Sequence, residues 1–107
     1  MSRRVVITGM GIVSCLGNDM DTVANALYEG RSGISIRQEN VDFGMRSHIA
    51  GAPEIDIPSL IDRKQLRFMG DAASFAYISM QQAITDAGLD ESEVSNVRTG
   101  IIAGSGG

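Results

Sequence analysis

The stretch RVVITGMGIVSCLGN, residues 4–18, places an apolar run directly before three glycines, a serine and the only cysteine of the chain. Residues 4–8 are largely β-branched and apolar without alternation, which is typical of a strand buried on both faces. Gly9 and Gly11 predict a turn after this strand, and Gly17 and Asn18 close that turn. We therefore interpret the stretch as a tight exit from a buried strand.

Two other interpretations of this stretch are weaker. A basic start at residues 2–4, an apolar run and Cys15 resemble a lipoprotein signal peptide, but Thr8 and the glycines interrupt the apolar segment. Gly9-x-Gly11 resembles the start of a dinucleotide fingerprint. Against that, Ser14 stands where a third glycine or alanine belongs, and Glu29 falls at a helix end rather than after a second strand.

The composition limits the protein class and its partners. The chain has 107 residues, a net charge of −4, 43% hydrophobic and 21% charged residues, which suits one small globular domain or part of a larger one. No apolar run is long enough to cross a membrane, and the acidic balance disfavours nucleic acid and anionic lipid. One cysteine and one histidine provide neither a disulfide nor a metal cluster, so a cytoplasmic location and no metal are expected.

The rest of the chain alternates helical and extended patterns, which predicts an α/β fold. We expect a helix from about Met20, capped by Asn18 or Asp19, with Val23, Ala26 and Leu27 on its apolar face and Gly30 at its end. The other predicted elements are extended pieces at 34–36 and 47–51, a helix over 59–69, a long helix from an Asp71 cap to Gly88, and a buried strand at 99–103. On the long helix, small residues repeat at intervals of three and four.

Cys15 and His48 are the obvious candidates for nucleophilic catalysis. A cysteine nucleophile needs a base and an oxyanion hole within reach. His48 is the only histidine and lies in the least patterned part of the chain. We interpret Cys15 as a small packing residue and His48 as a loop residue, and no carboxylate pair suggests an acid–base couple.

Arg63, Lys64 and Arg67 form the most informative charged cluster, because positions 63 and 67 lie one helical turn apart. One hypothesis is a solvated face partly neutralised by Asp62. The other is a docking patch for an acidic partner. The charge pattern alone leaves both open.

The order and spacing of seven motifs resemble the N-terminal quarter of the β-ketoacyl-acyl-carrier-protein synthases, the elongating condensing enzymes of bacterial fatty acid synthesis. The motifs are VVITGMGIVS (5–14), GRSGI (30–34), GMRSH (44–48), LIDRK (60–64), RFM (67–69), QAITDAGL (82–89) and GIIAGSGG (100–107). The GMRSH and LIDRK segments are more similar to class I than to class II members.

The resemblance implies a thiolase-like layered αβαβα fold, of which residues 1–107 would be the N-terminal, incomplete portion. It also implies a cytoplasmic homodimer that performs a decarboxylative Claisen condensation with acyl carrier protein as partner and without a cofactor. The family uses a cysteine at a helix N-terminus, two histidines and a lysine. No position here matches these residues, so we expect no catalytic residue in this segment and no activity from it alone.

Arg63, Lys64 and Arg67 do match the family's carrier-docking positions, and the resemblance therefore favours the docking hypothesis. A non-enzymatic carrier-binding module is the main alternative, and a dinucleotide-binding domain is a weaker one. The C-terminal glycines resemble the strand end near the family's acyl pocket.

Overall fold

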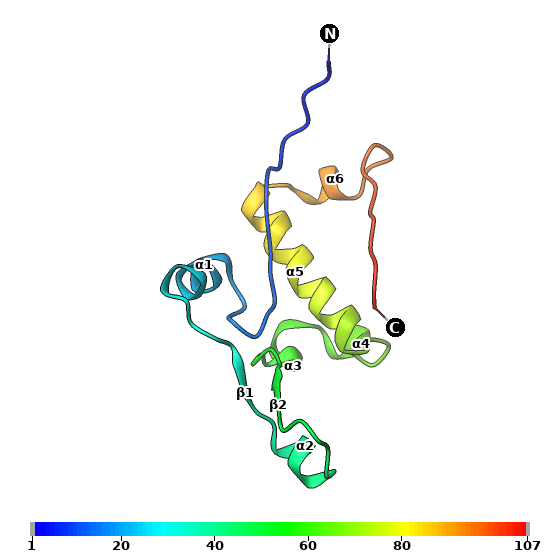
Figure 1. Ribbon diagram of the computed structural model, residues 1–107. Helices are drawn as coiled ribbons and strands as arrows, with labels where there is room; N and C mark the ends of the chain where they lie inside the picture. The colour runs from blue at the N-terminus through cyan, green and yellow to red at the C-terminus, as the bar shows by residue number, and fades with distance from the viewer. Residues whose placement is uncertain (1, 107) are drawn as a thin grey trace. The chain divides into compact units, whose positions relative to one another are not determined.

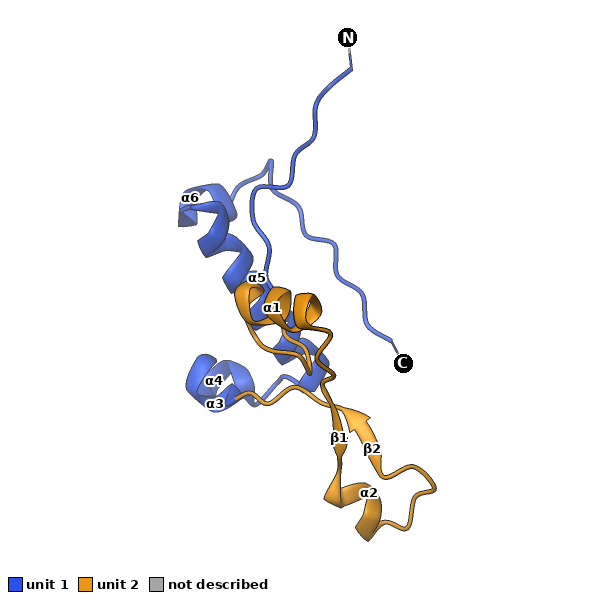
Figure 2. Ribbon diagram, turned by 60° about the vertical axis from the view of Figure 1, so that its left-hand side comes forward, with its two compact units in different colours: residues 1–12, 56–107 blue, residues 13–55 orange. Residues whose placement is uncertain are grey.

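The computed structural model describes residues 2–106, which form two compact units. One unit, Val13–Ile55, contains α1 (Met20–Glu29), β1 (Ile34–Ile36), α2 (Gln38–Asp42) and β2 (Ile49–Gly51). The other, Met1–Ile12 with Asp56–Gly107, contains α3 (Ile57–Leu60), α4 (Arg63–Leu66), α5 (Asp71–Ala87) and α6 (Glu91–Val94) (Figures 1 and 2). The mixed helix and strand content is consistent with the predicted α/β class.

Helix α1 begins and ends as its sequence predicts. The Asp19 carboxylate accepts hydrogen bonds from the Thr22 N–H and hydroxyl, each at 2.8 Å, and these bonds hold the pKa of Asp19 below its usual value. Gly30 ends the helix in the left-handed conformation at φ 68°, which glycine adopts without steric cost. Val23 and Ala26 are buried, but Leu27 is 67% exposed, so its assignment to the apolar face was wrong.

Strands β1 and β2 form an antiparallel hairpin in which Ile34 pairs with Gly51 and Ile36 with Ile49. Both extended pieces predicted for this region are confirmed, whereas α2 was not anticipated. The hairpin ends lie against Cys15. A Cβ added at Gly33 would stand 2.5 Å from the Cys15 carbonyl oxygen, and one at Gly51 would stand 2.9 Å from the Cys15 Sγ, so Cys15 leaves room only for glycine at both positions.

Residues 9–12 run as an extended segment along α5 rather than as the predicted turn. The Met10 N–H donates to the Asp86 carboxylate at 3.0 Å, and the Ile12 N–H donates to Gln82 Oε1 at 2.9 Å. A Cβ at Gly11 would overlap the Ser79 carbonyl oxygen. The glycines therefore permit close contact between backbone and helix.

The turn itself comes later, at residues 14–17. The N–H and carbonyl groups of Ser14 and Gly17 exchange two hydrogen bonds of 2.9 and 3.2 Å. The Ser14 hydroxyl accepts the Leu16 N–H at 3.2 Å and donates to the Gly17 carbonyl at 3.1 Å. The serine side chain thus stabilises the change of chain direction.

The helix predicted over 59–69 is interrupted. Ile61 is extended at φ −126° and ψ 135°, and only 4% of its surface is exposed. Asp62 then caps a new helical turn by accepting the Lys64 N–H. Burial of the Ile61 side chain, which is a tertiary effect, divides the segment into α3 and α4.

The long helix predicted to end at Gly88 is confirmed as α5, although its cap is Gly70 and Asp71 lies in its first turn. The Ser74 hydroxyl donates to the Gly70 carbonyl at 2.9 Å. At the other end, Gly88 at φ 69° is the predicted stop. The buried residues are Ser74 and Ile78, so the predicted small-residue stripe is only partly correct. Ala73 and Ala76 line an open depression of about 550 Å³ instead.

The predicted strands at 4–8 and 99–103 are wrong as strands in this structure. Neither segment forms ladder hydrogen bonds with another described segment, although both run extended in Figure 1. Their apolar side chains face solvent, with Val5 93% and Ile102 99% exposed. A strand needs a neighbour for its backbone groups, and the apolar pattern alone provides none.

Helix α6 is short and depends on its N-terminal cap. Asp90 and Glu93 form a capping box, in which each side chain accepts the other residue's backbone N–H at 3.0–3.1 Å. The Ser92 hydroxyl also donates to the Asp90 carboxylate at 2.6 Å, and this bond together with the Glu93 N–H lowers the pKa of Asp90.

Replacing Gly11 with alanine should destabilise the protein by about 1–3 kcal/mol, because the obstructing atom is a backbone carbonyl that cannot rotate away. Urea unfolding of the intact protein that carries this segment measures the loss. Gly70→Ala is the matched control, since its Cβ would meet nothing within 4 Å and its φ of −81° suits alanine. Equal midpoints for the two variants would show that residues 9–12 do not pack as described.

Candidate functional site

The three cations Arg63, Lys64 and Arg67, here called the basic patch, lie on and just after α4. The Arg67 N–H donates to the Arg63 carbonyl at 3.4 Å, so one turn of backbone places positions 63 and 67 on the same side. All three residues are exposed. The structure thus gathers the cations that the sequence singled out.

No described residue forms a contact ion pair with the basic patch. Among residues 2–106 the ion pairs are Arg31 with Glu29 and Arg37 with Glu39, each at 3.9 Å. Asp62, which the solvated-face hypothesis invoked, accepts the Lys64 backbone N–H instead. The side-chain charges therefore remain available to a charged partner. At physiological salt, they act on that partner within a Debye length of about 8 Å.

An aromatic residue that the sequence analysis missed lies beside the basic patch. The Arg67 guanidinium carbon stands 4.6 Å from the centroid of the Phe68 ring, within the range of a cation–π contact. Phe68 is 78% exposed. Adjacency of Arg and Phe in the sequence was the available signal, but it does not indicate exposure.

Cys15 lines a pocket that lacks the histidine with which a cysteine nucleophile is commonly paired. An open pocket of about 350 Å³ is lined by residues 14–18, residues 31–35, Ala52 and Glu54. No histidine or lysine belongs to this lining. His48 is exposed, and its carbonyl accepts the Arg37 N–H at 2.7 Å. The structure therefore does not bring Cys15 and His48 together as a nucleophile and a base.

The glycine-rich segment is not arranged to bind a nucleotide phosphate. A phosphate site of this type uses free backbone N–H groups at the start of a helix. Here the Met10 and Ile12 N–H groups bond to side chains of α5, and α1 begins only at Met20. The geometry argues against the dinucleotide hypothesis.

Other classes of site are also absent from the described part of the chain. None of its helices is both long and apolar enough to cross a membrane. Within residues 2–106 no three His, Cys, Asp or Glu side chains gather in a way that could hold a metal ion.

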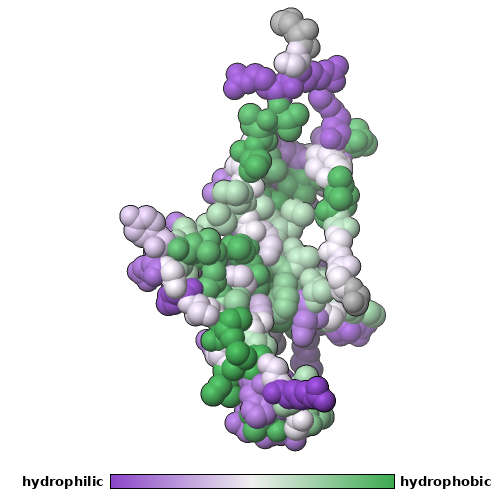
Figure 3. Space-filling model, viewed as in Figure 1, coloured by the Kyte–Doolittle hydropathy of each residue, from purple (hydrophilic) through white to green (hydrophobic). Residues whose placement is uncertain are grey.

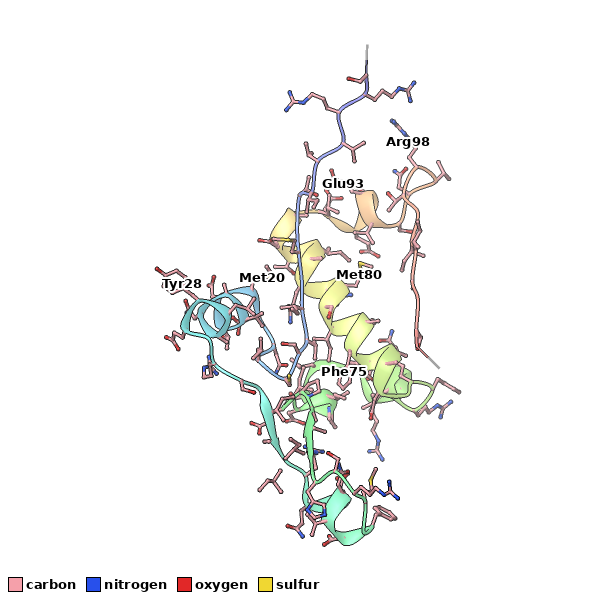
Figure 4. All side chains as sticks on the ribbon, viewed as in Figure 1. Met20, Tyr28, Phe75, Met80, Glu93 and Arg98 are labelled. Atoms are coloured by element: carbon pink, nitrogen blue, oxygen red, sulfur yellow. The ribbon has the colours of Figure 1, made fainter. Side chains whose placement is uncertain are left out.

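Apolar side chains are exposed in the unit that carries the basic patch. Figure 3 shows them along the extended N-terminal segment, where Val5 and Ile7 are 93% and 82% exposed. On α5, Met80 is 41% exposed (Figure 4). Large apolar residues at such exposure are typical of surfaces that contact other protein.

Known proteins similar to this chain agree on one family. Residues 2–107 match the family described as "Beta-ketoacyl synthase, N-terminal domain". The chain is 56% identical over 106 residues to 3-oxoacyl-[acyl-carrier-protein] synthase 1 of Escherichia coli K12, and 53% identical over 104 residues to that of Haemophilus influenzae. These matches cover 98% and 97% of this chain.

A 3-oxoacyl-[acyl-carrier-protein] synthase 2 from Coxiella burnetii is less similar, at 36% identity over 105 residues, or 97% of this chain and 25% of that protein. The chain spans about a quarter of the length of these relatives, 26% for both type 1 synthases. The family match nevertheless covers almost all residues of this chain. The chain belongs to the β-ketoacyl synthase family, in the N-terminal domain of that family.

Proposed function

We propose that this chain is the N-terminal part of a 3-oxoacyl-acyl-carrier-protein synthase of fatty acid biosynthesis. The 56% identity over 106 residues to a type 1 synthase is the observation that carries the proposal. An acyl group moves from its carrier thiol to an enzyme cysteine. Malonyl-carrier protein then loses carbon dioxide, and the resulting carbanion attacks the enzyme thioester and releases the cysteine thiolate.

In this proposal the segment provides scaffold and docking rather than bond-making groups. Cys15 lies between Gly33 and Gly51, and its pocket contains no histidine or lysine. A nucleophilic cysteine needs an environment that favours the thiolate, such as a helix N-terminus or a paired histidine. The nucleophile, histidines and lysine would therefore come from other parts of a longer chain.

The exposed apolar segments support the layered thiolase-like fold as a proposal for the intact protein. Residues 4–8 and 99–103 have the composition of buried strands but no ladder partner among the described residues. Pairing with further strands would satisfy their backbone groups and bury Val5, Ile7 and Ile102. A cytoplasmic homodimer is part of the same proposal.

The basic patch is the proposed docking site for acyl carrier protein. Its three exposed cations have no ion pair among the described residues, although the chain as a whole is acidic. A local positive surface attracts an acidic partner, whereas the acidic remainder of this chain repels that partner elsewhere. Charge complementarity is thus the physical basis of carrier recognition.

Reversing two charges of the basic patch, Arg63→Glu with Lys64→Glu, should weaken binding of acyl carrier protein by about tenfold at low salt. Titration of the intact protein with acyl carrier protein at two salt concentrations measures the dissociation constant. Arg98→Glu is a matched control, because Arg98 is exposed in the segment after α6 (Figure 4). Unchanged affinity of the double variant would support the solvated-face hypothesis.

The intact protein should convert acyl- and malonyl-carrier protein into a 3-oxoacyl product, and Cys15→Ser should retain this activity within about twofold, because serine is close in size to cysteine. Product formation and carbon dioxide release measure the activity of the wild type and of Cys15→Ser. Loss of acyl-enzyme in Cys15→Ser with unchanged unfolding would make Cys15 the nucleophile. No condensation by the wild type would favour the carrier-binding module instead.

A further inference from the structure

The backbone holds Phe68 in a defined position next to the basic patch. The Phe68 N–H donates to the Gln65 carbonyl at 3.1 Å, and the Met69 N–H donates to the Leu66 carbonyl at 2.9 Å. Leu66 and Met69 are half-buried, whereas Phe68 is 78% exposed. Leu66 and Met69 are the residues of this turn that pack inward, and the Phe68 ring therefore stays on the surface.

The ring restrains one of the two arginines of the basic patch. The Arg67 guanidinium carbon lies 4.6 Å from the Phe68 ring centroid. The electron-rich ring face attracts the cation, and a planar guanidinium stacked in this way keeps N–H groups at its edge for a carboxylate. No ion pair between Arg67 and another described residue competes with this arrangement.

Such restraint favours binding. A mobile arginine side chain on a protein surface loses conformational entropy when a partner immobilises it. An arginine whose guanidinium is already restrained loses less entropy on binding. Aromatic and arginine side chains are also the types most enriched at the energetic centre of protein interfaces. Phe68 and Arg67 combine both features beside two further cations.

We infer that Phe68 and Arg67 act as one binding unit in the docking of an acidic carrier protein. The Phe68 ring contacts an apolar side chain of the partner and also holds the Arg67 guanidinium toward a neighbouring carboxylate. The unit thus selects a surface on which a carboxylate lies beside an apolar residue, rather than any acidic protein. This inference rests on the proposed function of the basic patch.

A double-mutant cycle in the intact protein tests the unit. The dissociation constant for acyl carrier protein is measured at low salt for Phe68→Ala, Phe68→Leu, Arg67→Ala and the Phe68→Ala/Arg67→Ala pair. Phe68→Ala should weaken binding about fivefold, and Phe68→Leu should weaken it less, because leucine retains apolar area but has no ring face. In the Arg67→Ala background, Phe68→Ala should have less than half of its effect.

Controls separate docking from folding. Tyr28→Ala removes another exposed aromatic ring, 95% exposed on α1, and should leave the dissociation constant unchanged (Figure 4). Urea unfolding identifies any variant that loses stability. If Phe68→Ala does not fold, the more conservative Phe68→Leu in the presence and absence of Arg67→Ala provides the cycle.

Two results would overturn the inference: wild-type affinity in folded Phe68 variants, or effects of Phe68 and Arg67 that simply add. In either case the Arg63→Glu/Lys64→Glu variant shows which claim fails. If that charge reversal weakens binding, docking at the basic patch stands and only the Phe68–Arg67 unit is wrong. If it too leaves affinity unchanged, the docking proposal is wrong as well.

Discussion

The contact between residues 9–12 and helix α5 is the constraint on which the unit with the basic patch depends. Two backbone N–H groups, of Met10 and Ile12, reach acceptors on side chains one helical turn apart, Asp86 and Gln82. The same approach leaves no room for a Cβ at Gly9 or Gly11. The short distance between this segment and α5 and the two hydrogen bonds therefore depend on each other. Larger residues at positions 9 and 11 would move the segment away from the helix, and the two amides would then bond to water instead.

This constraint agrees with the interpretation of Cys15 as a packing residue. The chain turns at residues 14–17, beyond the contact with α5, and Cys15 is the second residue of that turn. Its carbonyl group approaches Gly33 and its sulfur approaches Gly51, at distances that leave no room for a Cβ at either glycine. The glycines of this segment that most resemble a catalytic or nucleotide-binding motif thus serve packing. What remains is electrostatic: three exposed cations, none of them in an ion pair with another described residue.

Local chemistry could be predicted from the sequence, and tertiary effects could not. Asp19 as a cap and Gly30 and Gly88 as stops depend on neighbours within a few residues, and these predictions were correct. Ile61 divides a predicted helix because its side chain is buried, and no nearby residue indicates that burial. Residues 4–8 and 99–103 have the composition of strands but no ladder partner among the described residues. For the site, sequence spacing identified the three cations. The capping of α4 by Asp62 and the contact of the Phe68 ring with Arg67 became visible only in the structure.

Hydrogen exchange of the Met10 and Ile12 amides in the intact protein, with and without NAD, tests the central claim most directly. The account predicts that both amides exchange slowly, as hydrogen-bonded groups do, and that NAD does not alter their rates. Fast exchange at both amides, or protection that appears only with NAD, would contradict it, because the glycine-rich segment would then be an open ligand loop.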